Sequence, residues 1–379
     1  MYVLWATISL AVVLVLALLN PGYFRYDIGD ADVMNDRVVA SAFLTGVNPY
    51  SDLDELAERF SSGRYNPPEV DPEFEGANRT PRTPGAIAIS SLLVLIPLDR
   101  LVQANNLLGA ILLVPVIFLI IRGQHHPRWL LLSLAVFFSA AMIWSIRFST
   151  ITPLVALVST FAIVGIRAGD KSSNGIAIAI AGTMKAFPLI LLVLAAAHRR
   201  WRTFGWGVGS LTIINLLPIL TPHVTFPEAM DALLGASARY GYTTVNTSLT
   251  RLISDVSDPI IGFATFALVI VFISWWIIVS PSNVATDAVI LLGVAILLAP
   301  LSWPHYALTF YPAALLFVSS PTTHFGPRTV AVASLFLAFP TGEPWAGAAG
   351  ILILTIVAVY QRVKLSPLRQ PLSVPFSAR

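Results

Sequence analysis

The chain has 379 residues, of which 56% are hydrophobic and only 11% are charged, with a mean hydropathy of +0.77. A soluble fold could not bury this much apolar surface, so the composition predicts an all-α polytopic membrane protein. The formal net charge of +3, with basic residues mainly at segment ends, argues against nucleic-acid binding, and the absence of cysteine excludes disulfides and thiolate metal sites.

Taken in chain order, the first hydrophobic segment is residues 2–19. A membrane span needs roughly 17 to 25 mainly apolar residues, which this segment supplies. It lacks the basic start and small-residue cleavage site of a secretory signal, so we expect residues 1–20 to be a retained anchor helix.

A polar stretch, residues 21–83, follows the anchor and holds 12 of the chain's 20 acidic residues and 6 of its 23 basic ones. We expect this loop to carry two short helices at the membrane surface. The first is amphipathic and covers 33–44, and the second covers 52–60. A solvated loop whose carboxylates only keep it soluble is the alternative.

Further hydrophobic segments bring the expected number of spans to about twelve in a single membrane domain, 1–379. Helices 2–7 fall within 84–220, at 84–97, 101–121, 129–146, 151–166, 174–197 and 204–220. A polar loop, 221–257, separates them from helices 8–12 within 258–363, at 259–279, 284–301, 306–318, 329–339 and 345–363. Residues 364–379 form a tail.

Basic loops stay in the cytoplasm, and the strongest are 198–202 and the tail. Counting spans from them places both termini inside and the loops 21–83, 221–257 and 302–306 outside. The basic loops 122–128 and 167–171 then also fall outside, against the rule. Either the bias is overridden there, or one short segment is not a span.

Three polar features interrupt the later segments. Lys185 lies inside a hydrophobic segment, where a lysine normally faces a cavity or a partner, although snorkelling at a helix break is the alternative. His305 follows Trp303 in the outer loop and could instead be an interfacial anchor. Asn246 and Ser248 lie in a polar stretch that also matches a glycosylation sequon.

Five motifs, in this order, resemble glycosyltransferase family 87 of the GT-C superfamily. They are Asp30-x-x-Val33, Gly46-x-Asn48-Pro49-Tyr50, Lys185-x-x-Pro188, Asn246-x-Ser248 and Ser302-Trp303-x-His305. The resemblance covers about residues 1–310 and implies a GT-C-like membrane fold. It also implies a polyprenyl-phosphate sugar donor, with mannose favoured and arabinofuranose possible, and a glycolipid or cell-envelope polysaccharide acceptor.

The resemblance also implies site residues. Asp30 would be the general base of an inverting displacement, with Asp32 as the alternative base, and His305 would be the second catalytic residue. Lys185 and Arg251 would bind the donor phosphate, and further donor contacts would come from Asn246, Ser248 and Trp303. No cofactor is expected, although Asp30 and Asp32 could together hold a divalent ion.

Two other classes fit the composition. A transporter or flippase of lipid-linked sugars or solutes would also have about twelve spans, kinked helices and an intramembrane lysine. Against it, the chain shows no internal repeat and its polar groups gather on one side. A scaffold protein would use 21–83 as an ectodomain but would leave the later polar motifs without a purpose. We therefore expect a plasma-membrane enzyme with its site on the extracytoplasmic side.

Overall fold

The computed structural model describes residues 31–67, 78–122, 127–137, 140–236, 246–256, 259–337 and 344–365. Across these ranges it contains seventeen α-helices and no strand, which confirms the all-α class. The expected anchor 1–20, the proposed base Asp30 and the tail from 366 lie outside the described residues.

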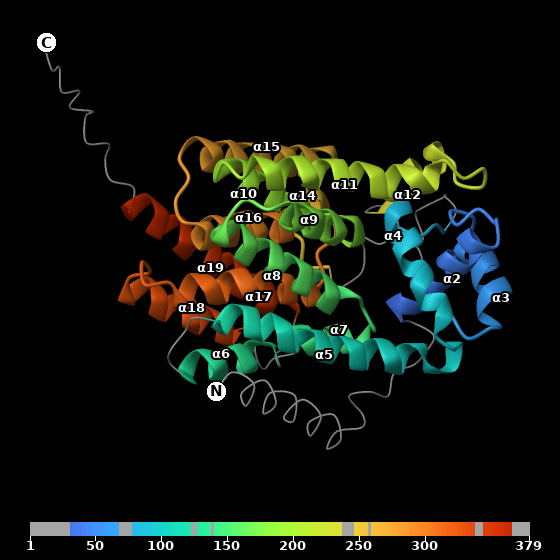
Figure 1. The fold of residues 1–379 in the computed structure, drawn as a ribbon, viewed down its shortest axis with the longest axis horizontal. Coiled ribbons are helices and arrows are strands. Elements are labelled where there is room, and N and C mark those ends of the chain that lie inside the picture. The colour runs from blue at the N-terminus through green and yellow to red at the C-terminus, as the bar shows by residue number, and fades with distance from the viewer. Residues whose placement is uncertain are drawn as a thin grey trace, which may run out of the picture.

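Most long helices run side by side along the long axis of the molecule (Figure 1). They are α5 (Leu101–Ile121), α8 (Thr152–Ala168), α11 (Trp201–Ile219), α15 (Pro259–Val279), α16 (Val284–Leu298), α17 (Ala307–Ser319), α18 (Phe325–Leu337) and α19 (Pro344–Leu365). The shorter α6 (Pro127–Phe137) and α7 (Ala140–Arg147) follow α5, and α14 (Leu249–Val256) precedes α15.

Within the described ranges, three helical stretches are long and apolar enough to cross a bilayer, at Leu98–Ile121, Ile261–Val279 and Gly347–Lys364. The packing is that of a membrane protein, in which a helix that is apolar on every side is exposed. Every residue of α17 is buried, whereas α15 exposes Leu268, Val271 and Phe272. Helix α17 is therefore the centre of the bundle, and α15 presents apolar side chains to its surroundings.

The polar stretch after residue 30 folds into a cap at one end of the bundle, the right-hand end in Figure 1. The cap contains α2 (Asp32–Leu44), α3 (Leu53–Ser61), α4 (Pro84–Ser90), the 3₁₀ helices η3 (Ser91–Leu95) and η4 (Leu98–Arg100), and α12 (Phe226–Leu234). The two helices expected at 33–44 and 52–60 are present as α2 and α3, respectively. Asp52 is the N-cap of α3, and its carboxylate accepts a hydrogen bond of 2.9 Å from the Asp54 amide.

The expectation that the first of these helices is amphipathic and lies in an interface is wrong. Helix α2 has buried residues on every side, including Val33, Met34, Val38 and Val39. It is enclosed because α3, α4 and η3 pack around it. The one fully buried carboxylate of α2, that of Asp36, is stabilised there by an ion pair with Arg82.

The segment 84–97 does not form a span along the bundle. Helix α4 runs across the end of the bundle instead of along it (Figure 1). Its α-helix ends at Ser90, and η3 continues only to Leu95 before Pro97. An apolar stretch this short cannot cross a hydrocarbon core, which takes about 20 residues.

The segment 174–197 is not one span either. It forms α9 (Ser172–Met184), a break at Lys185, the 3₁₀ helix η5 (Phe187–Ile190) and α10 (Leu191–Ala197). Lys185 has extended backbone angles, φ −146° and ψ 126°, and it is followed by Pro188, which cannot continue the hydrogen bonding of α9. The chain reverses at this break, so α9 and α10 form a hairpin.

Hydrogen bonds fix both ends of this hairpin at the same end of the bundle. Arg200 Nε donates to the Ile166 carbonyl oxygen at 3.1 Å. The Asp170 carboxylate accepts from the backbone amides of Arg202 at 3.0 Å and Thr203 at 2.7 Å. The basic loops 167–171 and 198–202 therefore lie together, and the conflict in the charge pattern came from counting the hairpin as one span.

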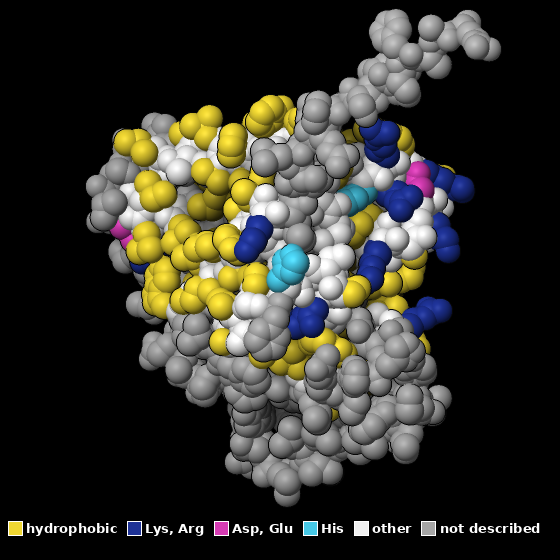
Figure 2. Space-filling model, turned by 90° about the vertical axis from the view of Figure 1, so that its left-hand side faces the viewer, with side chains coloured by type: hydrophobic (Ala, Val, Ile, Leu, Met, Phe, Trp, Pro, Cys, Tyr) yellow, Lys and Arg dark blue, Asp and Glu magenta, His cyan; other side chains and the backbone are white. Residues whose placement is uncertain are grey.

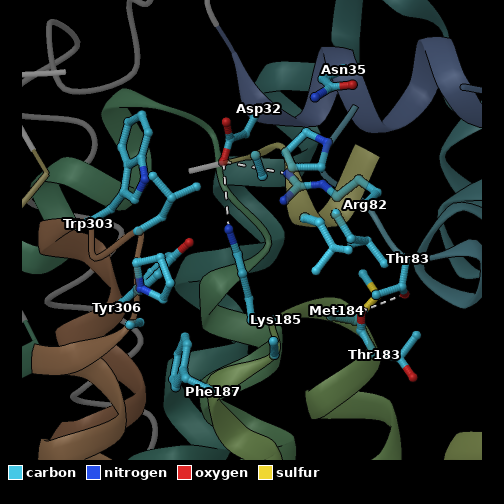
Figure 3. A pocket seen from close by; sticks show the side chains of 18 of the residues that line it. Asp32, Asn35, Arg82, Thr83, Thr183, Met184, Lys185, Phe187, Trp303 and Tyr306 are labelled. Carbon is cyan, nitrogen blue, oxygen red and sulfur yellow. Dashed lines mark hydrogen bonds and ion pairs between the residues drawn. The ribbon is translucent and has the colours of Figure 1, made fainter. Parts of the chain in front are cut away.

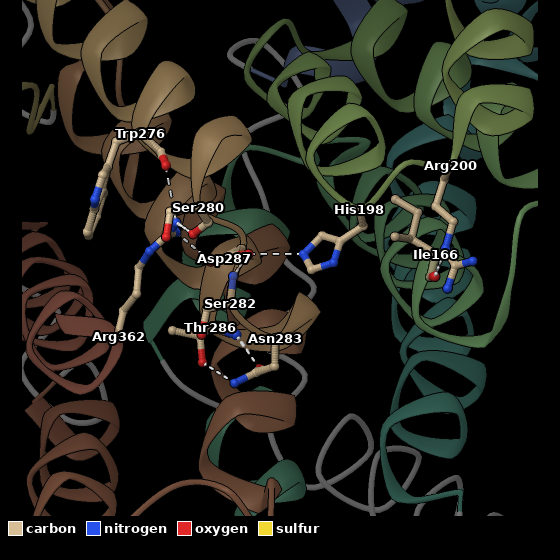
Figure 4. Close-up of polar contacts among 10 residues, drawn as sticks. All are labelled: Ile166, His198, Arg200, Trp276, Ser280, Ser282, Asn283, Thr286, Asp287 and Arg362. Atoms are coloured by element: carbon tan, nitrogen blue, oxygen red, sulfur yellow. Dashed lines mark hydrogen bonds and ion pairs between the residues drawn. The ribbon is translucent and has the colours of Figure 1, made fainter. Parts of the chain in front are cut away.

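Lysine and arginine side chains gather on the end of the bundle opposite the cap, as Figure 2 shows. Beneath this face, a fully buried carboxylate, Asp287 of α16, joins three segments (Figure 4). It contacts Arg362 Nη1 of α19 at 2.6 Å and His198 Nε2 at 3.0 Å, and it accepts a hydrogen bond of 2.9 Å from the Ser282 amide. The guanidinium of Arg362 also lies 4.1 Å from the Trp276 ring centre. This network closes the basic end of the bundle.

Candidate active site

A cavity of about 400 Å³ lies between the cap and the bundle. Its polar wall comes from α2, the 81–83 segment, the break after α9, and the segment between α16 and α17, which contains the 3₁₀ helix η6 (Pro304–Tyr306). The polar and aromatic side chains that line it include Asp32, Asn35, Arg82, Lys185, Trp303 and His305. Segments far apart in the sequence thus meet at one pocket (Figure 3).

Lys185 enters the pocket from the tip of the hairpin. The extended backbone at this residue directs its side chain away from α9 and toward α2 (Figure 3). Its Nζ atom lies 3.9 Å from Asp32 Oδ2 and 4.9 Å from the centre of the Tyr306 ring. The side chain is buried, so these two partners offset part of the cost of removing the ammonium from water.

Arg82 is a second buried cation in the pocket, and the sequence reasoning missed it. Its Nε donates to Asp36 Oδ1 at 2.5 Å, and its Nη2 lies 3.7 Å from Asp32 Oδ2. Burial alone would lower the pKa of Arg82, but the carboxylates of Asp36 and Asp32 outweigh it and raise that pKa. The guanidinium therefore stays charged. The only sequence signal was an arginine between Pro81 and Thr83, just before an apolar segment.

Asp32 lies in the first turn of α2 with its carboxylate at the pocket. Its backbone amide donates to the Phe148 carbonyl oxygen at 2.8 Å, which joins the start of α2 to the end of α7. The side chain is 32% exposed, in contrast to the fully buried Asp36. Asp30 precedes it by two residues and lies outside the described residues.

His305 lies in η6, between α16 and α17, and is 1% exposed. Neither of its ring nitrogens has a hydrogen-bond partner within the part of the chain that the structure describes. Burial lowers the pKa of His305 well below its ordinary value, and the positive charges of Lys185 and Arg82 lower it further. The imidazole is therefore neutral at neutral pH, with one nitrogen able to donate a hydrogen bond and the other able to accept one.

Aromatic rings surround His305. The Trp303 ring lies 5.6 Å from Phe148 in an edge-to-face contact, and Phe187 lies 4.9 Å from Tyr306. His305 meets Tyr306 edge to face at 4.9 Å. The pocket thus combines flat apolar surfaces, on which a sugar ring could stack, with two cations.

The model of glycosyltransferase family 87 matches residues 83–304. The chain belongs to glycosyltransferase family 87. The match extends over the hairpin tip at Lys185 and reaches Trp303 in the pocket wall. No curated protein and no solved structure matches the chain.

In this family-87 protein, Asn246 and Ser248 are not among the pocket-lining residues. The Asn246 side chain joins two segments: its Oδ1 accepts from the Ser302 amide at 2.9 Å, and its Nδ2 donates to the Pro300 carbonyl oxygen at 3.2 Å. Ser248 Oγ accepts from the Arg251 amide at 3.3 Å at the start of α14. The Asn246 contacts therefore hold the 300–302 segment, of which Pro300 lines the pocket.

Arg251 is also not among the pocket-lining residues. Its Nε lies 3.4 Å from Asp255 Oδ2, one helical turn further along α14. The expected site residues are therefore divided: Lys185, Trp303 and the expected catalytic residue His305 line the pocket, whereas Arg251 lies elsewhere. The second cation of the pocket is Arg82 and not Arg251.

The remaining wall of the pocket is apolar. Leu233 and Leu234 of α12, Phe263 of α15, and Leu301 line it. Leu234 is 71% exposed and Phe263 is also exposed on the outer surface. The charged interior of the pocket is thus continuous with apolar side chains that α12 and α15 present to their surroundings. Among the described residues, no group of three or more His, Asp and Glu side chains could hold a metal ion.

Proposed function

We propose that the protein transfers a sugar from a polyprenyl-phosphate donor to a hydroxyl of a glycolipid or cell-envelope polysaccharide. Mannose is the favoured sugar and arabinofuranose the second candidate. The observation that carries this proposal is the pairing of two buried cations, Arg82 and Lys185, with an apolar wall in one pocket. A lipid phosphate has the same two parts, an anionic group and a long apolar tail.

In the proposed reaction, the acceptor hydroxyl oxygen attacks the anomeric carbon of the donor. The bond between that carbon and the phosphate oxygen breaks, and the phosphate leaves with the electron pair. A carboxylate, which we assign to Asp30, takes the acceptor proton, while Arg82 and Lys185 stabilise the charge on the leaving phosphate. Direct displacement by one nucleophile predicts inversion at the anomeric carbon.

His305 has a distinct role in this scheme. A neutral imidazole with two unpartnered nitrogens can bond a sugar hydroxyl or a phosphate oxygen without adding charge. We expect the sugar to stack on the ring of Trp303, which lines the pocket. The acceptor and donor are both expected at the end of the bundle that carries the cap. The opposite end carries the basic loops, which supports an extracytoplasmic pocket in the plasma membrane with cytoplasmic termini.

The test is sugar transfer by the purified protein. Radiolabelled polyprenyl-phosphate mannose and polyprenyl-phosphate arabinofuranose are supplied separately with extracted envelope glycolipids. Wild type should label a glycolipid with one of the two donors, and Asp30→Asn should lose nearly all activity. Asp54→Asn, which removes an exposed carboxylate from α3, is the matched control and should act as wild type. Transfer by neither donor, together with donor movement across proteoliposomes, would favour a flippase instead.

A further inference from the structure

The carboxylate of Asp32 lies between the two cations of the pocket. Its Oδ2 atom is 3.7 Å from Arg82 Nη2 and 3.9 Å from Lys185 Nζ (Figure 3). Charge-assisted hydrogen bonds are about 2.7–2.9 Å long, so both contacts are loose. By contrast, Asp36 holds Arg82 at 2.5 Å from a fully buried position.

Among the described residues, four charged groups at this end of the pocket balance one another. Arg82 and Lys185 bring two positive charges, which Asp36 and Asp32 match. Of the two carboxylates, only Asp32 can exchange its partners for water, because its side chain is 32% exposed whereas that of Asp36 is fully buried. An anion that enters between the cations therefore competes with Asp32 and leaves the Asp36 pair intact.

We propose that Asp32 is a resident counter-ion of the phosphate site, which competes with the lipid phosphate for Arg82 and Lys185. This inference rests on the proposed function, since it identifies the competing anion as the lipid phosphate of that reaction. Asp32 thereby becomes a residue that discriminates between phosphates by charge.

The competition with Asp32 affects the product phosphate more than the donor phosphate. The donor is a phosphodiester with one negative charge, whereas the leaving product is a phosphomonoester that carries about −1.5 to −2 near neutral pH. A nearby carboxylate repels the product more strongly than the donor. Asp32 therefore weakens binding of the spent lipid phosphate more than binding of the donor, and it favours product release.

The test measures binding to the purified full chain in detergent, with farnesyl phosphate as the probe and farnesol as the uncharged control. Asp32→Asn should bind farnesyl phosphate about three- to tenfold more tightly than wild type, and both should bind farnesol equally. The asparagine keeps the backbone amide that bonds to Phe148. Asp32→Ser serves as a second neutral variant, and Asp32→Glu, which keeps the charge, should bind as wild type does.

Asp54→Asn controls for the loss of a carboxylate from the first turn of a cap helix and should change nothing. Equal or weaker binding of farnesyl phosphate by Asp32→Asn and Asp32→Ser would overturn the proposal. Tighter binding in a chain that transfers no sugar would sustain the counter-ion and refute the proposed reaction. Sugar transfer by wild type without tighter binding in the variants would support the proposed reaction and refute the counter-ion role of Asp32.

Discussion

Arg200 Nε donates a hydrogen bond to the backbone carbonyl oxygen of Ile166 across 3.1 Å, and this contact joins the end of α8 to the start of α11. Between these two points the chain has run through α9 and back through α10. The two helices reach the pocket below the cap and return. The hairpin can thus carry Lys185 at its tip while its base stays at the basic end.

The hairpin predicts that residues on its two sides face the same compartment. The chain has no cysteine, so single cysteines can be introduced directly. Lys171→Cys and Arg202→Cys should both react with a membrane-impermeant maleimide only after cells are permeabilised. Asp54→Cys in the cap should react in intact cells. Reaction of the first two variants from opposite sides would show that 172–200 crosses the membrane once.

Hydropathy could not have revealed this hairpin. A single apolar run from 174 to 197 has the length of one span. Lys185 and Pro188 inside it indicate a break, but they do not show that the chain reverses there. The helices of the cap were predictable because their signals are local. Asp52 caps α3, and Gly46, with φ +77°, follows α2 in a conformation that glycine adopts easily.

The candidate site was only partly predictable for a related reason. Lys185 and His305 stood out as polar residues in apolar surroundings. Arg82 did not, because it lies in a stretch already rich in charge and its role depends on contact with Asp36, 46 residues earlier. Asn246 was noticed, but its partners Pro300 and Ser302 lie more than fifty residues away. Such contacts cannot be read from spacing.

The role of Asn246 leads to a prediction that separates support of the wall from sugar binding. Asn246→Ala removes the side-chain bonds to Pro300 and Ser302, each worth about 1 kcal/mol net and more if a buried group is left unpaired. We expect a lower Tm together with lower transfer activity. Asn246→Asp keeps an acceptor for the Ser302 amide but turns a buried carboxylate oxygen toward the Pro300 carbonyl oxygen, so it should lower Tm as well. Lost activity at an unchanged Tm would instead indicate direct contact with the sugar.

The buried network at the basic end predicts a large loss of stability. Asp287→Asn leaves Arg362 buried without its carboxylate partner, and breaking a buried ion pair in this way costs about 3–5 kcal/mol. The midpoint of thermal unfolding in detergent should fall clearly. Asp255→Asn, which breaks an exposed ion pair with Arg251, should leave it nearly unchanged. Similar midpoints for the two variants would contradict the structural role of Asp287.

His305 predicts a specific dependence of stability on pH. Its pKa is lowered in the folded protein, so the unfolded chain binds a proton at His305 more readily than the folded chain. Its contribution to the free energy of unfolding is fully present above the ordinary histidine pKa of about 6.5 and is lost as the pH falls toward the folded value. Lowering the pH from 7.5 to 5.5 should therefore reduce the Tm of wild type more than the Tm of His305→Gln. A difference that does not vary with pH would mean that His305 already titrates normally in the folded protein.

The two cations predict different effects when each is replaced. Lys185→Met keeps a long side chain near Tyr306 but removes the ammonium, and loss of one charge-assisted contact of about 1.5–3 kcal/mol should lower kcat/KM for the donor by about 10- to 100-fold. Arg82→Lys keeps the charge but not the planar group that meets Asp36 through Nε and Asp32 through Nη2, so it should also lower activity and reduce Tm. Lys171→Met, at the basic end, is the control and should retain wild-type kinetics. If Lys185→Met transfers sugar as well as this control does, the phosphate cannot lie at the hairpin tip.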